Sequence, residues 1–94
     1  MKVYIAGKIT GLPQTEFVAN FKNVENILKD KGNQVLNPTR LFEYELEYEQ
    51  YMAIDRILIE AADAVYMLKN WEDSPGAMRD REHAIKLGKK IYYE

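Results

Sequence analysis

A strand-to-helix junction is predicted by the stretch NWEDSPGAMRDREHAIKLG, which runs from Asn70 to Gly88. The apolar run before it ends in polar turn residues. Ser74 and Pro75 then have the form of a helix start, with a hydroxyl N-cap followed by proline at the first helical position. Gly88 is placed to end that helix. The stretch therefore indicates an α/β fold in which a strand leads directly into a helix.

Three residues of this helix share one row at a period of 3.6 residues, namely Gly76, Asp80 and Ala84. The two small residues leave space beside the Asp80 carboxylate. The amides from Ser74 to Ala77, which a helix start leaves free, suit an anionic group such as a phosphate. Taken alone, however, the stretch fits a capped surface helix with one solvated aspartate better than a ligand site.

Length and composition indicate one domain spanning residues 1–94. A chain of 94 residues is large enough for one hydrophobic core and too small for two. A net charge of −2 gives no bulk attraction to a nucleic-acid polymer or a membrane. With no cysteine and one histidine, the chain lacks the ligands of a thiolate or a histidine-based metal site. The apolar runs are too short for a signal peptide or a membrane span, so we expect a cytoplasmic protein.

Hydrophobic periodicity predicts alternating strands and helices. Strands are expected at 2–6, 34–36, 63–68 and 89–93, and helices at about 14–31, 47–62 and 75–87. This order implies a three-layer, flavodoxin-like or Rossmann-like domain with a parallel sheet and helices on both faces, and we expect the strand order 2-1-3-4. The expected inward faces carry Phe17, Val18, Phe21, Val24, Ile27 and Leu28 in the first helix and Tyr51, Ile54, Leu58 and Ala61 in the second.

The segment 39–49 mixes glutamates with aromatic residues, and two interpretations of it stay open. It is either a solvated, partly helical connection or a flap whose tyrosine rings stack on a flat ligand. The loop from Gly7 to Pro13 is equally open. Its glycines let a ligand approach the backbone, and Lys8 and Thr10 offer a cation and a hydroxyl, but a plain turn fits as well.

The predicted strand order brings polar residues to one edge of the sheet, around its topological switch point. Asn37 ends the second strand, and Asp55 lies at the margin of the apolar face of the second helix. Asp55 is as well placed to line a site as to cap a neighbouring backbone group. We expect Lys8, Asn37, Asp55 and Asp80 to share one crevice.

The sequence resembles the nucleoside 2-deoxyribosyltransferase superfamily over nearly its whole length, and its short phage and bacterial members most of all. It is also similar to the 2′-deoxynucleoside 5′-phosphate N-hydrolases. The matching phrases are Val3-Tyr-Ile-Ala-Gly7 with Gly11, Asn37-Pro38, Asp55 with Ala62-Asp63, and Ser74-x-Gly76-x-x-x-Asp80-x-x-x-Ala84. No single phrase is diagnostic, but their order and spacing together are fairly specific.

The resemblance implies cleavage or transfer of the N-glycosidic bond of a deoxynucleoside or its 5′-monophosphate, without a metal or organic cofactor. In the family a carboxylate four residues after the motif glycine attacks the anomeric carbon, and here that residue is Asp80. The family residue is glutamate, so this chain is one methylene shorter at that position. A misplacement on the order of 1 Å can cost about a hundredfold in rate.

The resemblance also assigns supporting roles. Asp55 corresponds to a helix-borne aspartate that orients the substrate or donates a proton, Ser74 to a residue two before the motif glycine, and Tyr4 to an aromatic of the first strand. Thr10 stands where some phosphate-preferring members carry arginine, which leaves only Lys8 nearby. The full predicted substrate-binding set is Tyr4, Gly7, Lys8, Thr10, Asn37, Ser74 and Gly76.

Alternatives to an enzyme are a non-catalytic nucleotide-binding module that has lost turnover and a structural subunit without a ligand. The base, the acceptor and the need for a 5′-phosphate stay open. Because a chain of this size offers little depth for a nucleoside, and larger family members complete their site with a neighbouring subunit, we predict a homodimer or higher oligomer. Tyr48, Tyr51 and Met52 are the candidate interface.

Overall fold

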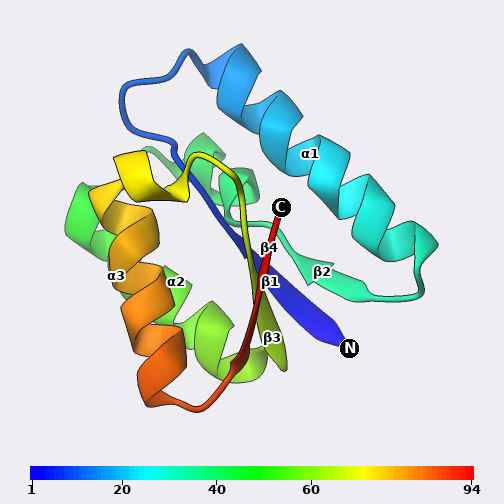
Figure 1. Ribbon diagram of the computed structural model, residues 1–94. Helices are drawn as coiled ribbons and strands as arrows, with labels where there is room; N and C mark the ends of the chain where they lie inside the picture. Colours follow the sequence, from blue (N-terminus) through cyan, green and yellow to red (C-terminus); the bar gives the residue numbers. More distant parts are fainter.

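The computed structural model describes residues 1–94 and contains every predicted strand and helix, with ends within one residue of those expected (Figure 1). The elements in chain order are β1 (Lys2–Ala6), α1 (Gln14–Asp30), β2 (Gln34–Leu36), the 3-10 helix η1 (Pro38–Tyr44), α2 (Tyr48–Ala61), β3 (Ala64–Met67), the 3-10 helix η2 (Trp71–Asp73), α3 (Pro75–Lys86) and β4 (Lys90–Tyr93). No helix combines the length and the apolar character that a membrane crossing requires.

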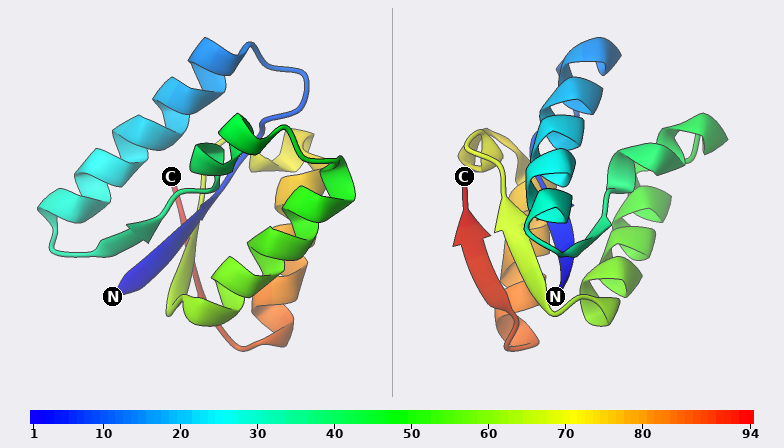
Figure 2. Two further views of the ribbon diagram at one scale, coloured as in Figure 1. Left: turned by 180° about the vertical axis from the view of Figure 1, so that it is seen from behind. Right: turned by 90° about the vertical axis from the view of Figure 1, so that its right-hand side faces the viewer.

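The sheet has the predicted order β2-β1-β3-β4, and every neighbouring pair is parallel. Tyr4 of β1 lies opposite Leu36 of β2 and Val65 of β3, which fixes the register at the centre of the sheet. Parallel strands need crossover connections, and the three α-helices supply them. Helix α1 covers one face of the sheet, whereas α2 and α3 lie side by side on the other (Figures 1 and 2). The three-layer α/β prediction is confirmed.

The core consists of two apolar clusters, one on each face of the sheet. Alternation along β1 separates them, because successive side chains of a strand point to opposite faces. Val3 and Ile5 pack against α1, while Tyr4 and Ala6 pack against α2 and α3. As a result Tyr4 is fully buried, with its hydroxyl group facing the two helices that carry the predicted carboxylates.

Two details of the predicted helix faces are wrong. In α1, Val18 and Ile27 are 38% and 53% exposed, because this single helix touches the sheet along a narrower stripe than the pattern suggested. In α2 the buried residues are Met52 and Ile59, while Ala61 is exposed, so the inward face is rotated by one residue toward β1 and α3. Met52 is only 5% exposed, which removes it from the predicted subunit interface.

Candidate active site

A cavity of about 600 Å³ opens beside the carboxyl end of β1. Its walls come from β1, the loop that follows β1, α1, η1, the first half of α2 and the first half of α3. Ligands of open parallel sheets bind at this edge. The cavity is large enough for a nucleoside-sized molecule and is lined mainly by apolar side chains, as small-molecule sites usually are.

Asp80 lies at the inner wall of this cavity, held by a residue from a distant part of the chain. The Tyr4 hydroxyl donates a hydrogen bond of 2.9 Å to Asp80 Oδ2. The other oxygen, Oδ1, is buried and has no hydrogen-bond partner. Asp80 itself is 5% exposed, between Ala77 and Ala84 of α3, which leave room for the carboxylate to reach β1. Burying a carboxylate oxygen without a hydrogen-bond partner costs stability, and such an oxygen is available to contact a ligand.

A second carboxylate, Asp55 of α2, lines the same cavity. Burial raises the pKa of Asp55 to about 6, and the nearby Tyr4 hydroxyl lowers it in part. Burial and the negative charge of Asp55 raise the pKa of Asp80 to about 8, against smaller lowering effects of Tyr4 and Arg79. Burial next to these two acids also raises the pKa of Tyr4 well above its usual value. Titratable groups with such strongly shifted pKa values are typical of functional sites.

The rings of Phe17, Phe42 and Tyr51 form an aromatic wall of the cavity. The Phe42 ring of η1 is stacked on Tyr51 with centroids 4.8 Å apart, and it meets Phe17 in a tilted arrangement at 5.0 Å. The Tyr51 hydroxyl accepts a hydrogen bond of 2.9 Å from the Leu46 amide, which fixes the ring. The segment predicted as a connection or a flap therefore contributes rings to the cavity, whereas its Tyr44 is 68% exposed.

Two glycines lie where a side chain would crowd the cavity. A Cβ atom at Gly7 would lie 2.5 Å from Leu68 Cδ1, so a side chain at this position would force Leu68 to move. A Cβ atom at Gly76 would lie 3.3 Å from the Tyr48 hydroxyl oxygen, which would have to shift slightly where α3 meets α2.

The structure brings most, but not all, of the predicted site residues together. The cavity is lined by Tyr4, Gly7, Thr10, Asp55, Ser74, Gly76 and Asp80. Lys8 and Asn37 are not among its lining residues, so the predicted four-residue crevice is reduced to the two aspartates. The Lys8 amide donates a hydrogen bond to Asn70 Oδ1 at 3.0 Å. Asn37 caps η1 through Thr39 and donates to Glu25 Oε1 at 2.9 Å, which turns its side chain toward α1.

The helix start of α3 also differs from the prediction of several free amides. The Ser74 side chain caps the helix by accepting from the Ala77 amide at 3.1 Å, and the Ser74 amide donates to the Trp71 carbonyl at 3.1 Å. Pro75 has no N–H group. Of the four residues from Ser74 to Ala77, only Gly76 retains a free amide at the cavity.

Sequence reasoning missed Glu25, whose side chain is fully buried in α1. Its carboxylate is 3.2 Å from Lys22 Nζ, 2.7 Å from Lys29 Nζ and 2.7 Å from Arg40 Nη2. Although burial raises its pKa, the hydrogen bonds from Lys29, Asn37 and Lys22 and the charge of Arg40 lower it to about 2. Glu25 thereby ties η1, with the aromatic wall, to α1. The lysines three residues before it and four after it were the available sequence signal.

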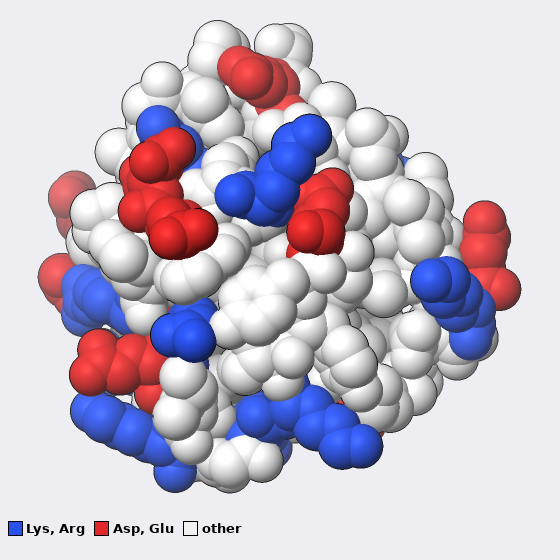
Figure 3. Space-filling view, in the orientation of Figure 1, with Lys and Arg blue, Asp and Glu red and all other residues white.

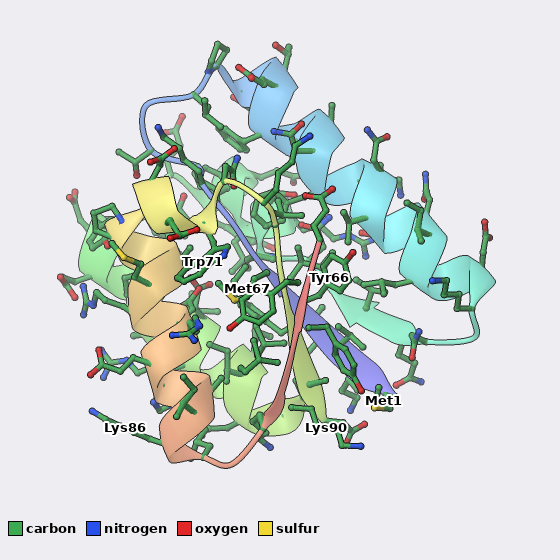
Figure 4. The ribbon with its side chains drawn as sticks, viewed as in Figure 1. Met1, Tyr66, Met67, Trp71, Lys86 and Lys90 are labelled. Atoms are coloured by element: carbon green, nitrogen blue, oxygen red, sulfur yellow. The ribbon has the colours of Figure 1, made fainter.

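Residues outside the cavity have structural roles. Trp71 packs between α3 and β4, with its ring 5.9 Å from Tyr93 and the Arg81 guanidinium over it at 5.0 Å (Figure 4). Glu82 pairs with Lys86 at 3.9 Å on the surface, as predicted. Acidic and basic side chains are interspersed on the face drawn in Figure 3. No group of three or more His, Cys, Asp or Glu side chains is arranged to hold a metal ion.

The fold is shared with a 2-desoxiribosyltransferase and a CMP N-glycosidase of known structure. The structure of a 2-desoxiribosyltransferase from Leishmania mexicana has a TM-score of 0.77 at 24% identity, covering 98% of this chain and 62% of that one. A CMP N-glycosidase, BcmB, from Clostridium botulinum has a TM-score of 0.72 at 19% identity, covering 99% of this chain and 70% of that one. The chain thus spans about two thirds of their length and has the same fold as these two proteins.

The family of this chain is shown by its sequence. Residues 1–93 match the family described as Domain of unknown function (DUF4406), and the chain belongs to that family. No curated protein matches the chain.

Proposed function

We propose that this protein cleaves or transfers the N-glycosidic bond of a deoxynucleoside or deoxynucleoside 5′-monophosphate, with Asp80 as the nucleophile. The observation that carries the proposal is the pair of acids in one cavity: Asp80, whose buried Oδ1 has no hydrogen-bond partner, and Asp55. The likeness of the fold to a deoxyribosyltransferase and an N-glycosidase supports the same chemistry.

The reaction uses one oxygen of Asp80 and one proton. Tyr4 holds Oδ2, so Oδ1 is the oxygen that attacks C1′ of the sugar. As the bond from this oxygen to C1′ forms, the bond from C1′ to the base nitrogen breaks, and the electron pair stays on the base. Asp55 supplies the proton that neutralises the leaving base. Water or a second base then attacks C1′, releases the Asp80 carboxylate and returns a proton to Asp55.

The pKa values of the two acids confine the reaction to the pH range in which the pair holds one proton. In the resting site this proton lies mainly on Asp80, whose pKa is the higher, so the reaction requires its transfer to Asp55. Two neighbouring carboxylates share one proton over the range between their pKa values, which here extends from about 6 to about 8. Below this range both are neutral and no nucleophile is present, and above it both are ionised and no acid is present. We therefore expect a bell-shaped dependence of kcat on pH, with its maximum near pH 7.

The test is release of free base from deoxynucleosides and their 5′-monophosphates by the wild-type protein and two matched variants. We expect Asp80→Asn to abolish release, because an amide cannot act as an anionic nucleophile, and Glu82→Gln to retain it. The Glu82 variant removes a carboxylate from the same helix at a surface ion pair. Loss of activity in Glu82→Gln with activity retained in Asp80→Asn would refute the assigned nucleophile. Binding of deoxynucleoside without release by the wild-type protein would favour a non-catalytic binding module.

A further inference from the structure

The cavity differs in charge from a site built for a phosphate group. Among its 22 lining residues, Asp55 and Asp80 are the acidic ones and none is basic, so the singly protonated pair leaves the cavity with a negative charge. The other lining residues are apolar or neutral, including the aromatic wall. A phosphate placed in this cavity would lose part of its hydration and would lie in the field of like charge.

The backbone at the helix start of α3 is already occupied by internal hydrogen bonds. A phosphate bound at a helix N-terminus is usually held by several free N–H groups. Here the Ser74 and Ala77 amides have acceptors within the protein, and Pro75 has no N–H group. The Ser74 hydroxyl oxygen is itself engaged as the acceptor of the Ala77 amide. One amide, that of Gly76, remains.

Basic side chains near this edge of the sheet are outside the cavity or already paired. Lys8 does not line it. Arg79 of α3 lies over the ring of Tyr48, a lining residue, at 5.8 Å, but its guanidinium also donates to both carboxylate oxygens of Glu49 at 3.2 and 3.3 Å. Thr10, in the loop after β1, lines the cavity with a neutral hydroxyl.

We infer that the site takes an uncharged deoxynucleoside in preference to the corresponding 5′-monophosphate. This inference rests on the proposed function and selects between the two substrate classes that it leaves open. The two acids that carry out the chemistry also set the preference, because the charge that activates the sugar repels a phosphate. The aromatic wall and the apolar lining stabilise a flat, neutral base.

The experiment compares each deoxynucleoside with its own 5′-monophosphate, by calorimetry for binding and by base release for kcat/KM. We expect the wild-type protein to favour the deoxynucleoside by at least about tenfold in both measurements, the scale of one repelled charge in a partly buried site. Thr10→Arg places a cation at the cavity and should reduce this preference by at least about threefold. Asn23→Arg, which adds the same charge on the exposed side of α1, should leave it unchanged.

The outcomes separate this inference from the proposed function. Faster release from monophosphates than from deoxynucleosides would overturn the inference and keep the proposed function. Binding that prefers deoxynucleosides, without release from either class, would support the inference and overturn the catalytic proposal. An equal response of Thr10→Arg and Asn23→Arg would contradict the inference that charge within the cavity sets the preference.

Discussion

Replacing Glu25 by glutamine tests how the cavity wall is held in place. Glu25 is fully buried and binds Lys22, Lys29 and Arg40, whose side chains are 54%, 48% and 63% exposed. A fall of its pKa from 4.5 to about 2 corresponds to at most about 3 kcal/mol of stability at neutral pH. Because water screens the three half-exposed cations, we expect Glu25→Gln to lower the free energy of unfolding by about 1–2 kcal/mol.

The pH dependence distinguishes a charge effect from a change in packing. The folded-state pKa of Glu25 lies below the unfolded value, so its contribution is complete above about pH 5 and is lost as the pH falls toward 2. Urea unfolding of wild type and Glu25→Gln should therefore give a difference at pH 7 that is about halved at pH 3. Glu16→Gln, at an exposed position in the first turn of the same helix, is the control and should change stability by less than about 0.5 kcal/mol. Equal free energies of unfolding for wild type and Glu25→Gln at pH 7 would refute this reasoning. So would a difference between them that is the same at pH 7 and pH 3.

Further predictions concern α3 and the turn after β1. Gly7→Ala should lower the free energy of unfolding by about 1–3 kcal/mol in urea titrations, because its Cβ would lie 2.5 Å from Leu68 Cδ1. Glu82→Gln removes a surface ion pair with Lys86 and should change the free energy of unfolding by no more than about 0.5 kcal/mol. The raised pKa of Asp80 makes the wild-type fold lose stability as the pH rises from about 4 through about 8. The free energy of unfolding of Asp80→Asn should therefore exceed that of wild type by at least about 1 kcal/mol at pH 9, and by less at pH 5. Asp80→Glu introduces the glutamate of the nucleoside 2-deoxyribosyltransferases and should raise the rate of base release. An unchanged or lower rate would show that the shorter side chain already reaches the sugar.

Local sequence patterns were sufficient for the fold and for the inward side of α3. The interpretation favoured by the stretch from Asn70 to Gly88 alone, a solvated Asp80, is wrong, because Asp80 is buried. Short β-branched and aromatic runs bounded by glycine or proline located the strands, and the spacing of Gly76, Asp80 and Ala84 predicted which side of α3 turns inward. The parallel order followed from the alternation of strands and helices. Each of these features depends on residues close together in the chain.

Features that depend on partners far apart in the sequence were not predictable in this way. The full burial of Glu25 requires Arg40 and Asn37 to approach from another element, and the same contact turns Asn37 away from the cavity. The amides at the start of α3 were expected to be free because the 3-10 turn of η2, which supplies the carbonyl group for the Ser74 amide, gave no recognised signal. The prediction that Met52 belongs to a subunit interface is wrong, because the packing of α2 against β1 and α3 rotates Met52 into the protein interior. The homo-oligomer itself stays a prediction, which light scattering at concentrations well above micromolar would test.

Covalent trapping tests the central claim most directly. The protein is incubated with 2-fluoro-deoxynucleosides, which slow the second step of a double displacement, and its intact mass and proteolytic peptides are then measured. We predict a fluorodeoxyribosyl adduct on the peptide that contains Asp80, and no adduct in the Asp80→Asn variant. Base release by the wild-type protein with an adduct on another residue, or with undiminished labelling of Asp80→Asn, would contradict the assignment of Asp80 as the nucleophile.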